Sequence, residues 1–440
     1  MMVNVNQLIE NDLNHIWHPC TQMKDFLETP PLVVHKAQGS YLYTDKGPVI
    51  DATSSWWCKS LGHGHPAVIE AIKKQLDCFE HVIAANTTHE KLVELGEKLA
   101  KISNKQHLFF ASDGSSAVEI AMKLALHASQ LKGQAHRNEF IALKNSYHGE
   151  TLATLSVSDT GLYKKPYEGY GVTCHFIQSI PYVSGSDDPL WQDAGVYWPS
   201  MLTELEKIKE NTCALIVEPL VQGANGMKCY SADFLTKLAH WTKENNIYFI
   251  ADEIMTGLGR TGQWLASHHA NIDADLICLS KGLTSGTLPL SCVLIDKAIY
   301  ELFYDDYDKG KSFLHSHTYS GNALAVSAAL ATLKIMESEG VNDQAKKTGQ
   351  LMRDNIQQIA SITSKLTNIR SLGAIVAADL QKDDVKRPGY RLYQEALHRG
   401  ALLRPLGNTL YWLPPLNTES SVIEALAEIT LNSIRAVYQQ

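Results

Sequence analysis

Residues 247–282 read IYFIADEIMTGLGRTGQWLASHHANIDADLICLSKG, and they contain two short apolar runs that each end near a charged side chain. The first run ends at Asp252 and the second leads to Lys281. Continuous apolar runs of this length are typical of strands buried on both faces of a parallel sheet. We therefore predict an α/β fold with both residues at the carboxyl ends of strands, the edge where such sheets bind ligands.

These two residues together indicate a particular chemistry. A lysine amine that is desolvated at this edge can lose its proton and attack a carbonyl, and a carboxylate beside it suits a pyridinium nitrogen. The pair predicts a pyridoxal phosphate enzyme in which Lys281 bonds the cofactor aldehyde and Asp252 pairs with the ring nitrogen. A lysine at a strand end is more commonly a solvated terminus, so the prediction depends on what surrounds it.

The rest of the chain alternates between strand and helix patterns, which predicts a mostly parallel sheet covered by helices. Strands are expected at 107–111, 140–143, 213–217, 247–251, 276–279 and 292–295, with a hairpin at 41–52 and helices at 67–78 and 115–128. Beyond residue 330, helices at 323–337, 342–359, 389–399 and 419–437 and strands near 375–380 and 402–412 predict a smaller α+β domain. Residues 161–198, rich in Pro, Gly and Tyr, are expected to be irregular.

We expect three segments from these patterns. Residues 1–60 form an N-terminal segment that contributes to the small domain, residues 61–330 form the large cofactor-binding domain, and residues 331–440 form the C-terminal small domain. The N-terminal residues 1–18 are polar, and no apolar run is long enough to span a membrane.

Composition excludes several classes of function. The formal net charge of -8 and the pI near 6.1 disfavour nucleic acid as a partner, because phosphate binding needs clustered Lys and Arg. The eight cysteines are scattered without C-x-x-C spacing, as reduced thiols are, and we expect a cytoplasmic protein. Paired histidines such as His63 and His65 lack metal-ligand spacing, so no metal is expected. The glycines at 257–262 follow no strand directly, which disfavours a dinucleotide fold.

Two further motifs follow predicted strands. Gly114 and Ser115 open the helix after residue 111, and a helix N-terminus with small residues can bind a phosphate. An ordinary helix cap is the alternative. Tyr147, after the strand at 140–143, could stack on a pyridine ring, although a surface loop would look the same.

The motifs in this order resemble the class III pyridoxal phosphate aminotransferases of fold type I, over nearly the whole chain. The matching motifs are Gly114-Ser115, Tyr147-His148-Gly149, Glu218-Pro219, Asp252-Glu253, Gly257 to Gly262, Ser280-Lys281-Gly282 and Thr318 to Asn322. The resemblance implies catalytic roles for Lys281, Asp252 and Tyr147. It also implies a homodimer with shared active sites, in which Thr318, with His317 beside it, reaches the cofactor phosphate of the partner subunit.

Three markers are most similar to one branch of that family, which aminates 8-amino-7-oxononanoate in biotin biosynthesis with S-adenosylmethionine as donor. They are Ile16 to Pro19, Ser54 to Trp57, and Arg404-Pro405 with Leu413 to Pro415. The resemblance implies that Arg404 binds the acceptor carboxylate, for which a buried ion pair is the alternative. Trp56 and Trp57 would line the path of the methylene chain, although adjacent tryptophans are otherwise mostly core residues.

Some positions depart from the family pattern. Cys20 stands where a substrate-contacting tyrosine is common, Ser316-His317 replaces Gly-Pro before Thr318, and Glu150 replaces a frequent aspartate. Cys20 and Ser316 remain expected substrate neighbours. The departures leave open a lysine-using enzyme of the same branch or a general ω-amino acid or diamine aminotransferase. A glutamate-1-semialdehyde-type mutase and a cofactor-binding regulator fit the sequence less well.

Overall fold

A seven-stranded sheet forms the centre of the molecule. The computed structural model describes residues 4–439, and the order of strands across this sheet is β4-β13-β12-β11-β8-β5-β6. Only β13 runs against its neighbours, so the expected mostly parallel sheet is confirmed. In sheet order, the strands are His107–Ala111, Ser291–Ile295, Leu276–Leu279, Tyr248–Asp252, Thr212–Val217, Glu139–Leu143 and Cys174–Ile177.

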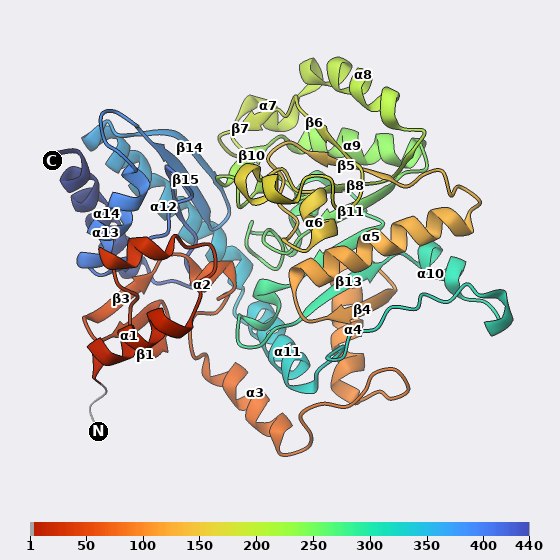
Figure 1. Ribbon diagram of the computed structural model, residues 1–440, viewed down its shortest axis with the longest axis horizontal. Helices are drawn as coiled ribbons and strands as arrows, with labels where there is room; N and C mark the ends of the chain where they lie inside the picture. Colours follow the sequence, from red (N-terminus) through yellow and green to blue (C-terminus); the bar gives the residue numbers. More distant parts are fainter. Residues whose placement is uncertain (1–3, 440) are drawn as a thin grey trace.

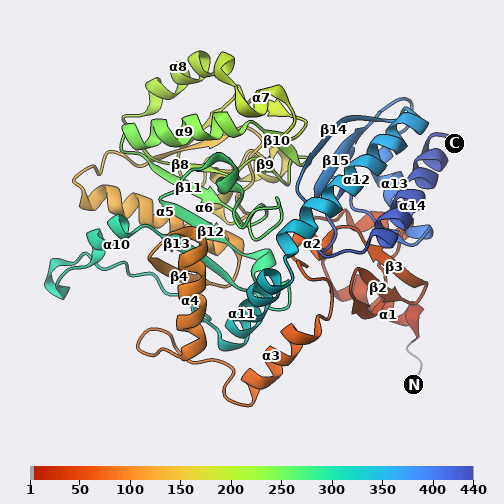
Figure 2. The same cartoon turned by 180° about the vertical axis from the view of Figure 1, so that it is seen from behind.

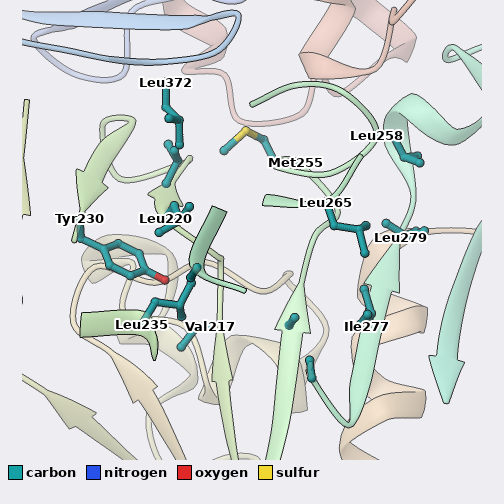
Figure 3. Close-up of a cluster of buried hydrophobic side chains, with 14 of the residues drawn as sticks. Val217, Leu220, Tyr230, Leu235, Met255, Leu258, Leu265, Ile277, Leu279 and Leu372 are labelled. Carbon is teal, nitrogen blue, oxygen red and sulfur yellow. The ribbon is translucent and has the colours of Figure 1, made fainter. Parts of the chain in front are cut away.

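Helices cover both faces of this sheet, because successive strand residues point to opposite sides. On one face, α5 (Gly114–Leu131) packs on residues such as Phe140, Ile216 and Ile250. The other face carries α4 (Glu90–Ser103), α8 (Trp198–Ile208), α9 (Ala232–Glu244) and α11 (Ala323–Ser338). Figure 3 shows part of this second core, where Leu235 of α9 lies near Val217 at the end of β8.

The two ends of the chain meet in a second region beside the large sheet. The N-terminal strands β1 (Val34–Gln38), β2 (Tyr41–Thr44) and β3 (Gly47–Asp51) form a sheet with β16 (Ala401–Leu402), which lies parallel to β3. Figures 1 and 2 show these red strands among the blue C-terminal elements. The blue elements are β14 (Leu366–Leu372), β15 (Ile375–Leu380), β17 (Thr409–Trp412), α12 (Val341–Thr363), α13 (Pro388–His398) and α14 (Ser420–Gln439).

The structure corrects two expectations. Residues 161–198 are not irregular throughout, because β6 lies within them and forms an edge of the large sheet beside β5. The strand expected at 402–412 is two strands in different sheets, β16 and β17, with a loop around Arg404 between them. Shorter elements complete the chain: α1 (Val5–His15), α2 (Ser54–Trp57), α3 (Pro66–Leu76), α6 (Leu152–Ser156), α7 (Pro189–Gln192), α10 (Lys297–Phe303) and a sheet of β7 (Tyr182–Val183), β10 (Lys228–Tyr230) and β9 (Val221–Gln222). Within residues 4–439, no helix is long and apolar enough to cross a membrane.

Candidate active site

A cavity of about 190 Å³ opens at the carboxyl ends of the parallel strands. Five of the residues expected at the site line this cavity: Lys281, Asp252, Tyr147, Gly114 and Ser115. They come from the ends of four strands, because Gly114 and Ser115 both follow β4, and the sheet itself brings them together. The remaining lining residues are Trp57, Asp113, His148, Gly149, Glu218, Ile254 and Met255.

Lys281 lies two residues after the end of β12, with a φ angle of 40°. Its Nζ is 5.1 Å from the ring centroid of Trp57, which forms an apolar wall beside the amine. Desolvation in the cavity lowers the pKa of Lys281, against the opposing effects of the Asp252 and Glu218 carboxylates. A lowered pKa favours the neutral amine, the form that can bond a carbonyl.

Asp252 is the last residue of β11 and is held by a histidine. Its Oδ2 lies 2.7 Å from Nδ1 of His148, and its Oδ1 accepts the Ile254 backbone N–H at 3.2 Å. Both side chains are buried, and Nε2 of His148 has no hydrogen-bond partner among the described residues. A donor on Oδ2 stabilises the ionised carboxylate. The sequence motif Tyr147-His148-Gly149 contains His148 but did not predict its role beside Asp252. Its position directly after Tyr147, which was expected at the site, could have indicated that role.

Glu218 connects the Tyr147 loop to the site. Its two carboxylate oxygens accept the backbone N–H groups of Tyr147 and Gly223, each at 2.9 Å. Burial raises the pKa of Glu218 to about 7, and the Asp252 carboxylate adds to the rise while His148 opposes it. The side chain therefore fixes the backbone that carries Tyr147, whose hydroxyl donates to Oε1 of Glu150 at 3.0 Å.

The start of α5, where the sequence predicts a phosphate site, opens into the cavity at Gly114 and Ser115. The cap alternative also holds, because Oδ1 of Asp113 accepts the Ser116 N–H at 2.9 Å. Space is tight: a Cβ at Gly114 would lie 3.0 Å from Cδ1 of Ile254. At Gly149, where φ is 128°, a Cβ would lie 2.7 Å from Oγ1 of Thr154. Free N–H groups and close backbone approach suit a phosphate.

The two tryptophans take different positions. Trp57 is buried in the cavity wall and donates from Nε1 to the Tyr411 hydroxyl at 3.1 Å, whereas Trp56 is 43% exposed. The guanidinium of Arg404 lies 4.7 Å from the Trp56 ring centroid and donates to the Cys20 carbonyl at 3.1 Å. Arg404 is exposed and has no carboxylate partner among the described residues, so the alternative of a buried ion pair is wrong.

The segment around Thr318 does not line the cavity of its own chain. Ser316 and Thr318 are exposed, and the Thr318 carbonyl accepts from Nε2 of His81 at 2.9 Å. Nε2 of His317 is hydrogen-bonded to the Ser112 hydroxyl, next to the start of α5. The structure thus brings His317 close to the start of α5 in its own chain, while Ser316 and Thr318 are exposed.

The cavity fits pyridoxal phosphate at each of its functional ends. The Asp252 carboxyl, hydrogen-bonded to His148, suits a pyridine nitrogen, and the Lys281 amine, whose pKa is lowered by burial, suits the aldehyde. The amino end of α5 suits the phosphate, and Tyr147 lines the cavity between these groups. These are the groups that the sequence motifs placed at one site.

Known proteins agree with this geometry. Residues 24–434 match the family described as aminotransferase class-III. An adenosylmethionine-8-amino-7-oxononanoate aminotransferase from Helicobacter pylori is 38% identical, over 94% of this chain and 95% of that protein. The crystal structure of the enzyme of the same name from Methanocaldococcus jannaschii superposes with a TM-score of 0.91 at 31% identity, covering 98% and 99% of the two chains.

An amine transaminase from an uncultivated Pseudomonas species, solved with its pyridoxal phosphate bound, is also similar. Its TM-score is 0.88 at 28% identity, covering 96% of this chain and 99% of that one. The chain therefore belongs to the class III aminotransferases, pyridoxal phosphate enzymes of fold type I.

Proposed function

We propose that this protein transfers an amino group from S-adenosylmethionine to 8-amino-7-oxononanoate, giving 7,8-diaminononanoate in biotin biosynthesis. The names of relatives that match over nearly the full chain support this reaction. The observation that carries the acceptor is Arg404, an exposed guanidinium that has no carboxylate partner within residues 4–439 and lies on Trp56, next to the cavity wall at Trp57. Such a group suits a carboxylate at the far end of a long apolar chain.

Different residues of the chain would serve different parts of the reaction. Pyridoxal phosphate, when bound, supplies an electron sink for the reacting carbon. The Lys281 amine, whose pKa is lowered by burial, would carry the proton between the substrate carbon and C4′ of the cofactor, as general base and then general acid. Asp252, which His148 holds in place, would pair with the pyridine nitrogen and favour its protonated form. Tyr147 would stack on the pyridine ring, and Gly114 and Ser115 at the start of α5 would hold the phosphate.

Departures from the family pattern near the mouth of the cavity bear on which amino donor the enzyme uses. Cys20 lies there through the contact of its carbonyl with Arg404, and Tyr163 lies beside it. Burial raises the pKa of Tyr163, and Cys20 and Glu150 add to the rise, so its phenol stays protonated. We infer that Tyr163 supplies a phenol at the mouth. Lysine as donor, or a broader ω-amino acid or diamine specificity, remains the second candidate because of the Cys20 and Ser316-His317 departures.

We further propose a cytoplasmic homodimer with shared sites, in which Thr318, next to His317, reaches the cofactor phosphate of the partner subunit. The exposure of Thr318, and of the apolar Leu314 and Tyr319 near it, supports this arrangement. We also propose domain boundaries at residues 1–60, 61–330 and 331–440. The pairing of β3 with β16 supports joining the first segment to the last.

The half-reactions test this function. Absorbance of the bound cofactor should change on adding S-adenosylmethionine, and the aminated enzyme should return to its starting spectrum with 8-amino-7-oxononanoate. Lysine and alanine, tried as donors, separate the second candidate from the first. If no donor supports conversion of the oxononanoate, the acceptor assignment is wrong.

A variant of Arg404 tests the observation that carries the proposal. Loss of one partner of a buried charge pair costs about 2 to 5 kcal/mol, and the exposure of Arg404 places it near the lower end, roughly 30-fold in acceptor efficiency. Arg404→Ala should therefore impair the acceptor half-reaction and leave the donor half-reaction nearly unchanged. Arg399→Ala, which removes another partly exposed arginine that is paired with Glu395, is the matched control. Equal loss in both half-reactions would mean that Arg404 is structural.

A further inference from the structure

Residues 54–57 form a turn whose handedness is opposite to that of an ordinary helix. The φ angles of Ser54, Ser55, Trp56 and Trp57 are 48°, 44°, 72° and 72°, and the stretch contains no glycine. The Trp57 N–H donates to the Thr53 carbonyl at 2.8 Å, as in a helical turn. The left-handed conformation is unfavourable for residues with a Cβ. Such strain persists only where surrounding contacts impose it, and it clusters at functional sites.

The buried carboxylate of Asp51 is at the centre of those contacts. Its Oδ1 accepts the backbone N–H and the hydroxyl of Thr53, at 3.2 and 3.1 Å. Its Oδ2 accepts the Ser55 hydroxyl at 2.7 Å and lies 2.9 Å from Nε2 of His63. Burial by itself would raise the pKa of Asp51, but hydrogen bonds from His63 and Ser55 hold the pKa below its ordinary value. The Asp51 carboxylate is thus the common acceptor for donors of Thr53, Ser55 and His63.

The opposite side of the turn is bonded to the C-terminal part of the chain. The Ser54 hydroxyl donates to the Leu413 carbonyl at 2.7 Å, and Nε1 of Trp57 donates to the Tyr411 hydroxyl. Leu413 in turn donates its N–H to the Ala52 carbonyl at 2.8 Å. The turn is therefore held between the end of β3 and the end of β17.

The turn presents its two indoles to different parts of the site. Trp57 forms the wall beside the Lys281 amine, and Trp56 lies under the Arg404 guanidinium. A change in the backbone at Ser55 would move one indole relative to the other. It would therefore change the fit of any molecule that has to span the path from the reacting amine to the guanidinium.

We propose that Asp51, together with His63, is a positioning residue for acceptor specificity: it imposes the left-handed turn and so sets the placement of Trp57 relative to Trp56. The acceptor class, a long-chain oxo acid whose carboxylate meets Arg404, rests on the function proposed above. The donor does not require the span between the two indoles. The effect of losing Asp51 should therefore fall on the acceptor.

Asp51→Ala in the holoenzyme should raise the KM for 8-amino-7-oxononanoate by about 10- to 100-fold, the range expected for displacement of a substrate-positioning group. The donor half-reaction should stay close to that of the wild type. Adding Ser55→Gly should recover most of the loss, because glycine adopts a positive φ without strain. Adding Ser55→Ala, which lacks the same hydroxyl but keeps the Cβ, should not. Ser433→Ala, which removes a buried hydroxyl within α14, controls for general loss of stability and should leave both half-reactions unchanged.

A substrate-free measurement separates this proposal from the proposed function. In the holoenzyme labelled with 5-fluorotryptophan, the ¹⁹F signals of Trp56 and Trp57, assigned with Trp→Phe variants, should shift in Asp51→Ala and return with Ser55→Gly. If the wild type converts no oxononanoate, the function fails but these signals still test the turn. If Asp51→Ala does not fold, Ser55→Ala alone should show a smaller shift and a smaller rise in KM. Unmoved signals, parallel loss of both half-reactions, or equal behaviour of the glycine and alanine double variants would each overturn the proposal.

Discussion

Removal of the hydrogen bond between His148 and Asp252 should slow both half-reactions. His148→Leu deletes the donor on Oδ2 of Asp252 and keeps an apolar side chain in the buried space. His148→Asn is the matched variant, because its amide nitrogen can take the place of Nδ1 and still donate. The His148 backbone N–H, which donates to Ser158 at 2.8 Å, is retained in both.

The expected loss of rate follows from the geometry of the hydrogen bond between His148 and Asp252. The bond is 2.7 Å long, both groups are buried, and the carboxylate has one other donor, the Ile254 N–H at 3.2 Å. Hydrogen bonds to charged groups contribute about 1.5 to 3 kcal/mol. Loss of this hydrogen bond should weaken the interaction of Asp252 with the ring nitrogen by an energy of that size. Since about 1.4 kcal/mol is a factor of ten in rate, His148→Leu should lose about 10- to 100-fold in kcat.

Stopped-flow absorbance of the bound cofactor measures this directly, with donor and acceptor in separate single-turnover experiments. His148→Leu should slow both half-reactions by similar factors, since Asp252 serves the cofactor and not one substrate, while His148→Asn stays within a few-fold of the wild type. Circular dichroism and cofactor content confirm that each variant is folded and loaded. Equal impairment of the two variants, or a normal rate in His148→Leu, would refute the role of this hydrogen bond.

Three further predictions concern the amine, the buried acid and the dimer. Lys281→Ala should reduce turnover in a steady-state assay by several orders of magnitude, and its spectrum should lack the visible absorption of the lysine-bound cofactor. Transamination at a rate near that of the wild type would contradict the mechanism. The pKa of Glu218 is raised to about 7 from an unfolded value of 4.5, so the folded protein binds this proton more tightly than the unfolded chain does. The free energy of unfolding, measured by denaturant titration, should therefore fall by up to roughly 3 kcal/mol as pH rises from about 4.5 to 7. Glu218→Gln should flatten that dependence, and an unchanged slope would assign it to other groups. Thr318→Ala should weaken cofactor retention, and mixing it with Lys281→Ala should regenerate activity if sites are shared; a fully active monomer in ultracentrifugation would contradict this.

The sequence predicted the central sheet because its strands are continuous apolar runs. Such runs occur where both faces are covered by helices, and the structure confirms each of the six that were expected there. The same logic located the cavity, since a polar residue directly after a buried strand has to lie at the sheet edge. Asp252 pairs with Cys278 of β12, so register alone brings Lys281, three residues beyond, to the same end.

Other features depend on tertiary contacts that a single sequence does not express. β6 was hidden in a segment rich in Pro, Gly and Tyr because its strand character comes from pairing with β5 at the sheet edge. The exposure of Arg404 follows from the loop between β16 and β17, where an apolar context in the sequence had suggested burial. The left-handed turn at 54–57 contains no glycine, so the local sequence did not predict it. It follows from the Asp51 contacts.

The site is built from two kinds of support with different consequences for evolution of specificity. Lys281 and Asp252 are fixed by the register of neighbouring parallel strands about 4.8 Å apart, and moving either would disrupt the sheet. Trp56, Arg404 and Cys20 come instead from turns and loops at the two ends of the chain, outside that sheet. Substitutions there can change which acceptor fits without altering the geometry of the amine and the carboxylate. Substrate preference should therefore vary in this family through the N-terminal segment and the loop after β16, for the acceptor at Trp56 and Arg404 and for the donor at Cys20, while the contribution of Lys281 and Asp252, which depends on the strand ends, stays intact.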